Sequence, residues 1–96
     1  MKKFMLLHVG FEKPTQEIMN DWMKWFESIS DKTVDGGFGF GTAREITRAG
    51  SKELPLGLDS MTGYTIINAE NIEEAEKIAK TCPMITGIRV YEARSM

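Results

Sequence analysis

The sequence is poor in the residues that build metal centres, disulfide frameworks and membrane spans. Its 96 residues include one cysteine and one histidine, which excludes an intramolecular disulfide and a cysteine-based zinc site. No run approaches the roughly 18 apolar residues that a spanning helix needs. Cations are not in excess either, because 12 Lys and Arg stand against 14 Asp and Glu, whereas a nucleic-acid binder needs a cationic face. We therefore expect no metal, no cofactor, no nucleic-acid partner and no membrane partner.

The first residues resemble a secretory signal only briefly. Lys2 and Lys3 precede an apolar run over residues 4–7, but His8 interrupts that run and no small-residue cleavage site follows. We therefore expect a cytoplasmic protein in which Cys82 is a reduced thiol.

The length predicts one small domain over residues 1–96. A chain of this size removes only about 60–65% of its unfolded surface from water, so its stability is marginal. A partner subunit would add buried surface and stabilise the fold.

Three segments have the pattern of β-strands. They cover residues 3–9, 63–69 and 87–93, which are short and rich in apolar and β-branched side chains. The first of them is apolar at successive positions and therefore on both faces. That pattern is typical of a central strand covered on two sides.

Two segments have the pattern of amphipathic helices. The first runs from an N-cap at Thr15 to about Lys32, and the second from an N-cap at Asn71 to Thr81, with Pro83 ending it. The apolar stripe of the first helix is Ile18, Trp22, Trp25, Phe26 and Ile29. We interpret the two tryptophans as packing anchors. Cys82 ends the stripe of the second helix, where burial and the negative helix end disfavour a reactive thiolate.

The pattern over residues 36–60 is weaker. Glycine alternates with phenylalanine over 37–41, which favours a bulge or a close backbone approach and has the wrong spacing for a dinucleotide site. We predict the second strand over 38–48, with 42–47 as its best strand material. Residues 49–60 are predicted to form a long loop, where binding residues are often found.

The resulting order, β-α-β-β-α-β, predicts an α+β, ferredoxin-like domain with a four-stranded antiparallel sheet and both helices on one face. The other face would then be left uncovered. The apolar and aromatic residues expected on that uncovered face are Phe4, Leu6, Tyr64, Ile66 and Tyr91. An uncovered apolar face promotes association, so we expect a homodimer in which two sheets pack face to face and enclose a barrel.

Four segments, KKFMLLHVG, MNDWMKWFESI, GYTIINAENIEEAEKIAKTCP and IRVYEA, resemble the YCII-related proteins of the DGPF type. The resemblance covers nearly the whole chain and is most specific in its C-terminal half. It implies the ferredoxin-like unit of dimeric α+β barrels, in agreement with the fold predicted from the residues. It implies little about activity, because most members of the family have no assigned reaction.

Two features of that family are missing here. Some relatives have a histidine in the first helix that pairs with an aspartate and is suspected of acid–base chemistry, but the first helix of this chain has no histidine. The DGPF tetrapeptide is also absent: Asp59-Ser60 lies in the corresponding region, and no Gly-Pro-Phe follows. Neither feature can be transferred, and the catalytic residues stay unknown.

Four residues are candidates for binding a small molecule: His8, Tyr64, Arg89 and Tyr91. His8 is predicted to share the barrel face with Arg89 and Tyr91, since the first and last strands should be neighbours. Such a cluster would bind a small anion or acid, with His8 as proton donor or acceptor and Arg89 as a clamp. Alternatively, His8 bonds to a neighbouring group, Arg89 pairs with a Glu across the dimer, and the tyrosines lie in the interface.

Three functions stay open from the sequence. The first is a homodimer that binds a small molecule in the cavity between its two sheets. The second is a cofactor-independent dimeric-barrel enzyme with His8 as acid or base. The third is a purely structural or interaction module, which would have a close-packed dimer core and no pocket.

Overall fold

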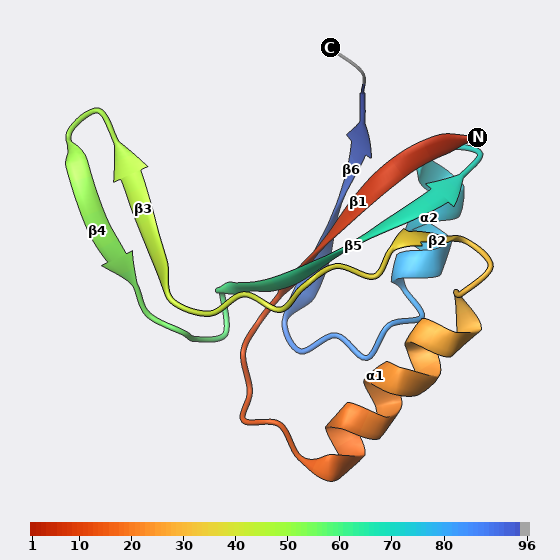
Figure 1. The fold of residues 1–96 in the computed structure, drawn as a ribbon, viewed down its shortest axis with the longest axis horizontal. Helices are drawn as coiled ribbons and strands as arrows, with labels where there is room; N and C mark the ends of the chain where they lie inside the picture. The colour runs from red at the N-terminus through yellow and green to blue at the C-terminus, as the bar shows by residue number, and fades with distance from the viewer. Residues whose placement is uncertain (95–96) are drawn as a thin grey trace.

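The computed structural model describes residues 1–94, which form an α+β fold (Figure 1). Its elements are β1 (Lys2–Val9), α1 (Gln16–Ser28), β2 (Thr33–Asp35), β3 (Ala43–Thr47), β4 (Gly50–Leu54), β5 (Met61–Ala69), α2 (Ile72–Ala79) and β6 (Gly87–Ala93). Four strands make an antiparallel sheet in the order β2-β5-β1-β6. This is the predicted ferredoxin-like arrangement, and the fold prediction is confirmed. Residues 95 and 96 of the predicted domain lie outside the described residues.

The second strand of the sheet is not the one that the sequence predicted. Strand β2 covers only Thr33–Asp35 and pairs with β5, whereas we had expected residues 38–48 in this place. Residues 43–47 do form a strand, β3, but β3 pairs with β4 in a separate hairpin. The predicted loop over residues 49–60 therefore contains a strand. A three-residue strand is too short to show a period of two, which is why the sequence did not reveal it.

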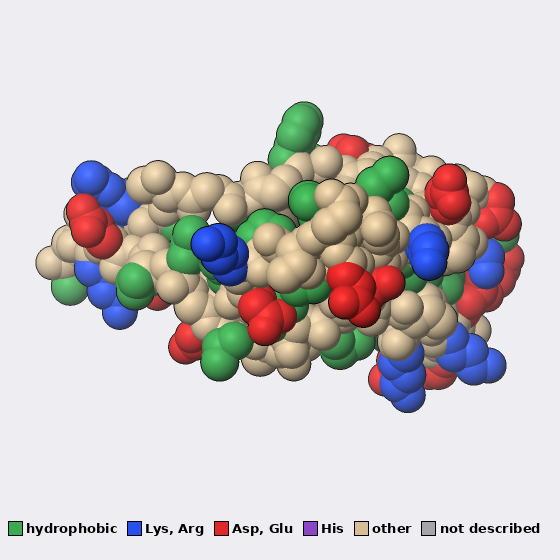
Figure 2. Space-filling model, turned by 90° about the horizontal axis from the view of Figure 1, so that it is seen from below, with side chains coloured by type: hydrophobic (Ala, Val, Ile, Leu, Met, Phe, Trp, Pro, Cys, Tyr) green, Lys and Arg blue, Asp and Glu red, His purple; other side chains and the backbone are tan. Residues whose placement is uncertain are grey.

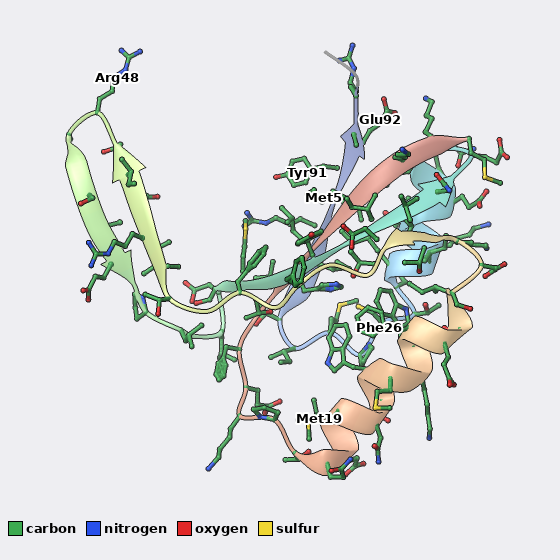
Figure 3. All side chains as sticks on the ribbon, in the orientation of Figure 1. Met5, Met19, Phe26, Arg48, Tyr91 and Glu92 are labelled. Carbon is green, nitrogen blue, oxygen red and sulfur yellow. The ribbon has the colours of Figure 1, made fainter. Side chains whose placement is uncertain are left out.

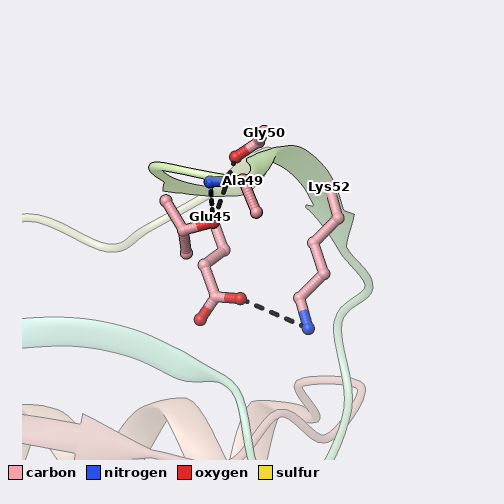
Figure 4. Close-up of polar contacts among 5 residues, drawn as sticks. Glu45, Ala49, Gly50 and Lys52 are labelled. Atoms are coloured by element: carbon pink, nitrogen blue, oxygen red, sulfur yellow. Dashed lines mark hydrogen bonds and ion pairs between the residues drawn. The ribbon is translucent and has the colours of Figure 1, made fainter.

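The β3–β4 hairpin, which we call the arm, stands away from the rest of the molecule (Figure 1). Glu45 and Lys52 are opposite each other across its two strands, and Lys52 Nζ lies 3.2 Å from Glu45 Oε2 (Figure 4). At its turn the Ala49 amide donates to Thr47 Oγ1 at 3.2 Å. Every residue from 44 to 54 is exposed. In the space-filling view the arm is a lobe, narrower than the body, that carries charges of both signs (Figure 2).

Both helices lie on one face of the sheet and build the core there (Figure 1). Phe4 and Leu6 of β1 are fully buried in this core, where they are joined by Trp25 of α1 and by Ile29, the C-cap residue of that helix. The other core residues are Ile67, Ala69, Ala75, Ile78, Ala79 and Cys82. The prediction that Phe4 and Leu6 occupy the uncovered face is therefore wrong. Because β1 is apolar on both faces, its alternation separates the faces correctly but does not tell which face the helices cover.

The uncovered face of the sheet carries the other set of β1 side chains. Met5 is opposite Ile66 of β5 and Tyr91 of β6, and Leu7 is opposite Tyr64. Directly opposite residues in antiparallel strands point to the same face, so Tyr64, Ile66 and Tyr91 lie where the sequence predicted. Met5 and Tyr91 project from the sheet on the side of the arm, away from the helices (Figure 3).

The helix starts follow the predicted capping. The Thr15 hydroxyl accepts a hydrogen bond from the amide of Ile18, and the Asn71 side chain accepts one from the amide of Glu74. Helix α1 ends at Ser28, a turn earlier than predicted, because the chain there turns toward β2. Within residues 1–94 no helix has the length and apolar character to cross a membrane.

Candidate functional site

A cavity of about 980 Å³ lies between α1 and the sheet. Helix α1 supplies one wall, including Met19, Trp22 and Phe26, and His8 of β1 belongs to the sheet side. Met19 and Phe26 stand on the side of α1 that faces the sheet (Figure 3). The loop after β2 closes another side with Phe38. The cavity size lies at the upper end of the range of about 300–1,000 Å³ that is usual for small-molecule sites.

The cavity forms because only part of the apolar surface of α1 reaches the core. Trp25 and Ile29 are buried, whereas Met23 and Met19 are 65% and 45% exposed. The methionines form a second apolar row beside the main stripe, and this row borders the cavity together with Phe26. One face of α1 is therefore packed into the core, and a neighbouring face with Met19, Met23 and Phe26 borders the cavity.

His8 is held on the sheet by a fixed set of neighbours. Its Nε2 lies 2.9 Å from Oγ1 of Thr65, a fully buried residue of β5. Its ring stands edge-on to Trp22, with centroids 5.0 Å apart, and to Trp25 at 5.8 Å. Its Nδ1 is buried and has no hydrogen-bond partner among the described residues. His8 lines the cavity but is itself only 8% exposed, so a ligand would reach Nδ1 only if the imidazole ring turned toward the cavity.

Burial keeps His8 uncharged. Desolvation lowers the pKa of its imidazole from 6.5 to about 4, because the aromatic surroundings disfavour the imidazolium. The only charged residue that lines the cavity, among those the structure describes, is Glu12. At neutral pH the cavity therefore holds a neutral imidazole, apolar walls and one carboxylate.

The four candidate residues do not form one cluster. His8 is opposite Ile88 of β6, so it lies on the helix-covered face, whereas Arg89 and Tyr91 lie on the uncovered one. The prediction that His8 shares a face with Arg89 and Tyr91 is wrong, although β1 and β6 are neighbours as expected. His8 lies on the same face of β1 as Phe4 and Leu6, and all three were predicted on the wrong face. Tyr64 borders the cavity, and Arg89 and Tyr91 do not.

Tyr64 belongs to an aromatic group at the β2 edge of the sheet. Its hydroxyl donates to Asp35 Oδ2 at 3.3 Å, and its ring stacks on Phe40 with centroids 6.0 Å apart. Phe38 lies 6.4 Å away on the same side. Burial and the neighbouring Asp35 carboxylate raise the pKa of Tyr64, so the phenol is neutral.

The glycine-rich loop reaches this position by a close backbone approach, as the sequence predicted. Gly37 has φ +77°, and a Cβ built on it would lie 1.8 Å from the carbonyl oxygen of Tyr64. Gly39 forms a bridge with Gly63, and the Phe40 amide donates to the Thr62 carbonyl at 2.8 Å. These contacts fix Phe38 at the edge of the cavity.

Sequence reasoning did not find Thr65 or the cavity walls. Thr65 is one of several β-branched residues in β5 and has no distinguishing neighbour in the sequence. The exposed row of α1 did leave a signal, since Met19 and Met23 broaden the apolar stripe beyond the width that one sheet contact needs.

The structure also bears on two other kinds of site, a metal site and a reactive cysteine. No group of three or more His, Cys, Asp or Glu side chains in residues 1–94 has an arrangement that could hold a metal ion. Cys82 is buried, and burial raises the pKa of its thiol to about 11, which makes it a poor nucleophile at neutral pH.

Comparisons with known proteins identify the fold. No protein-family model matches the sequence, and no curated protein matches it. Among solved structures, the chain is similar to 5-chloro-2-hydroxyhydroquinone dehydrochlorinase (TftG) from Burkholderia phenoliruptrix AC1100, solved in complex with 2,5-dihydroxybenzoquinone. The TM-score is 0.61 with 13% sequence identity, over 98% of this chain and 95% of that one. The likeness shows that the two chains share an α+β fold.

Proposed function

We propose that this protein binds a small, uncharged molecule with an apolar, ring-containing body in the cavity beneath α1. The observation that carries the proposal is the cavity of about 980 Å³ with mainly apolar walls, lined by His8, whose buried Nδ1 has no partner among residues 1–94. Buried polar atoms are nearly always paired. A ligand that brings one hydrogen-bonding group to His8 and apolar surface to α1 would complete this site.

The walls of the cavity define the ligand further. Trp22 and Phe26 offer ring faces, and Met19 offers a flexible, polarisable surface that adapts to irregular shapes. The described lining has no cationic side chain that could neutralise an acidic ligand, and the Glu12 carboxylate would repel an acidic ligand. The earlier expectation of an anion or acid as ligand depended on Arg89, which lies on the other face. We therefore favour a neutral ligand.

The structural neighbour supports this proposal only by analogy. It binds a ring compound on the same fold, and a fold alone does not determine a function. The resemblance to YCII-related proteins, which we keep as a proposal for the family, agrees with a small-molecule role without specifying one.

A second candidate function is proton-transfer catalysis by His8. The geometry favours it in one respect: Thr65 fixes the imidazole through Nε2 and leaves Nδ1 free for a substrate. The lowered pKa argues for binding first, because a pKa of about 4 makes His8 a weak base at neutral pH. In this role Nδ1 would have to be the unprotonated nitrogen, with Nε2–H donating to Thr65 Oγ1.

We also propose that two copies pair through the uncovered sheet face. Met5, Ile66 and Tyr91 give this face an apolar character, and Tyr91 is 54% exposed in the single chain. Two-fold dimers are the commonest homo-oligomers, and in them the same surface of both copies meets. We also propose a cytoplasmic location, which is compatible with a chain whose single cysteine, Cys82, has no disulfide partner of its own.

A matched pair of ligands tests the binding proposal. Methyl 4-hydroxybenzoate and 4-hydroxybenzoate share a ring and differ in one negative charge at pH 7.5. We expect isothermal titration calorimetry to show saturable binding of the ester and binding of the acid that is about tenfold weaker or more. Preferred binding of the acid would overturn the charge argument.

A variant with a filled cavity locates the binding. Met23→Trp adds a ring to the cavity wall at a residue that is 65% exposed, so the fold should be kept. Met1→Trp, at an exposed residue outside the cavity, is the control. Loss of ester binding in Met23→Trp alone supports the site, and unchanged binding in both variants would place the ligand elsewhere.

A further inference from the structure

The arm has no core of its own and little contact with the body. Its strands β3 and β4 bond only to each other among the described residues, and Ile46 near its end is 79% exposed. A two-stranded hairpin in water is marginally stable at best. An ordered arm of this kind therefore calls for a surface that it lies against.

The exposed area of the chain indicates how much surface a partner would cover. The chain exposes 7142 Å², whereas a monomeric protein of its mass exposes about 5,500 Å². The excess of roughly 1,600 Å² is about twice what each partner contributes to a standard interface. The radius of gyration, 14.3 Å, likewise exceeds the value of about 12.5 Å for a compact chain of this length.

The sheet face cannot supply such an interface alone. Four strands spaced about 4.8 Å apart and at most nine residues long cover about 500 Å². This is less than the roughly 800 Å² per partner of a stable complex. The arm is the other large exposed element, and it stands on the side toward which Tyr91 and Met5 point (Figure 3).

Strand β6 offers the arm a place to dock. It is an edge of the four-stranded sheet, and Arg89, Tyr91 and Glu92 on it are exposed. A free edge has unpaired backbone groups that accept a further strand. The seven residues of β6 are long enough for the five of either arm strand.

We propose that the arm of each copy lies along the β6 edge of a second copy of this chain. The proposal rests on the pairing of sheet faces proposed above and names what completes that interface. Two-fold symmetry makes the exchange reciprocal, since each copy has one arm and one free β6 edge. Both surfaces carry charges of both signs: Arg44, Arg48, Lys52, Glu45 and Glu53 on the arm, and Arg89 and Glu92 on β6.

An arm-shortened variant tests this. Ala43 and Leu54 are directly opposite each other, so an Asn-Gly turn can replace residues 44–53 without disturbing the body. The control, Arg48→Asn with Ala49→Gly, changes the turn and keeps both strands. By sedimentation velocity we expect a wild-type dimer, the same dimerisation constant in the control, and a constant about tenfold weaker or more in the shortened variant.

Hydrogen exchange gives a second measurement that does not depend on a variant. We expect amides of residues 44–54 and 87–93 to gain protection together as the wild-type concentration rises through the dimerisation range. A shortened variant that dimerises like the wild type, or arm amides that stay unprotected in the dimer, would overturn the arm exchange and leave the sheet pairing standing. A wild-type monomer at high micromolar concentration would overturn both.

Discussion

His8 and Thr65 face each other from adjacent central strands, with Nε2 and Oγ1 2.9 Å apart and both residues buried. The Thr65 hydroxyl has no other hydrogen-bond partner among residues 1–94, so it satisfies its one hydrogen only by donating to Nε2. We therefore expect the imidazole hydrogen on Nδ1. The ligand proposed for the cavity would then present an acceptor, such as a carbonyl oxygen, to His8. A ¹⁵N–¹H correlation spectrum of the His8 ring checks the tautomer.

Stability should depend on pH through His8. The pKa of His8 is about 4 in the folded protein and 6.5 when the side chain is exposed. Between these two pH values the unfolded chain therefore binds a proton at His8 that the folded chain does not bind. The free energy of unfolding therefore falls from pH 6.5 to about 4, by on the order of 3 kcal/mol, and the loss levels off below pH 4. Urea denaturation of the wild type and of His8→Gln across this range measures it. Parallel curves for the two proteins would contradict the assignment.

Removal of the Thr65 hydroxyl should destabilise the core. Thr65→Val keeps the shape of the side chain and leaves Nε2 of His8 without a partner, which costs about 1–3 kcal/mol. Thr42→Val, at an exposed position, is the control and should change the free energy of unfolding by less than about 0.5 kcal/mol. Equal effects of the two substitutions would mean that the hydrogen bond contributes nothing.

The glycine pair before Phe38 allows a backbone test. Gly37→Ala forces an L side chain into φ +77° and against the Tyr64 carbonyl, so we expect a loss of about 3 kcal/mol. Gly36→Ala meets nothing within 4 Å and should be close to neutral. Chemical denaturation of both variants decides whether the loop lies against β5 as described.

Trp22 should contribute to ligand affinity more than to folding. It is half-buried and borders the cavity, so Trp22→Leu should weaken binding of the ester by about tenfold. Lys24→Ala, at an exposed residue of α1 that does not line the cavity, should bind normally. An unchanged affinity in Trp22→Leu would remove α1 from the site.

The thiol of Cys82 should be unreactive in the folded protein. Burial raises its thiol pKa to about 11, so at pH 8 its reaction with a disulfide reagent should be slower than that of a free cysteine by about a hundredfold. Addition of denaturant should restore the ordinary rate. A fast native reaction would show that the end of α2 opens.

The sequence predicts the elements with strong patterns and misses those without one. Strand β6 was predicted with its observed bounds, and α2 and β5 within two residues, because capping and β-branched runs are local signals. Strand β2 is three residues long and shows no period. The arm is exposed on both faces, so no alternation marked β4 as a strand.

The candidate site was harder to predict than the fold. The choice of face for His8 depends on the side to which both crossover helices go, and a strand that is apolar on both sides does not encode that choice in its own residues. The cavity depends on how far α1 stands from the sheet, which is a property of the packed molecule. The local trace of the cavity is the additional apolar row of Met19 and Met23 on α1, which the sequence analysis did not use.

Helix α1 divides two tasks between its faces. Trp25 and Ile29 hold it to the protein, while Met19, Met23 and Phe26 border the space beneath it. Substitutions at these three positions can therefore alter ligand selectivity with little effect on the anchor. A scaffold of this kind lets related chains diverge in what they recognise while keeping one architecture, and it gives protein engineers a short, contiguous segment to randomise.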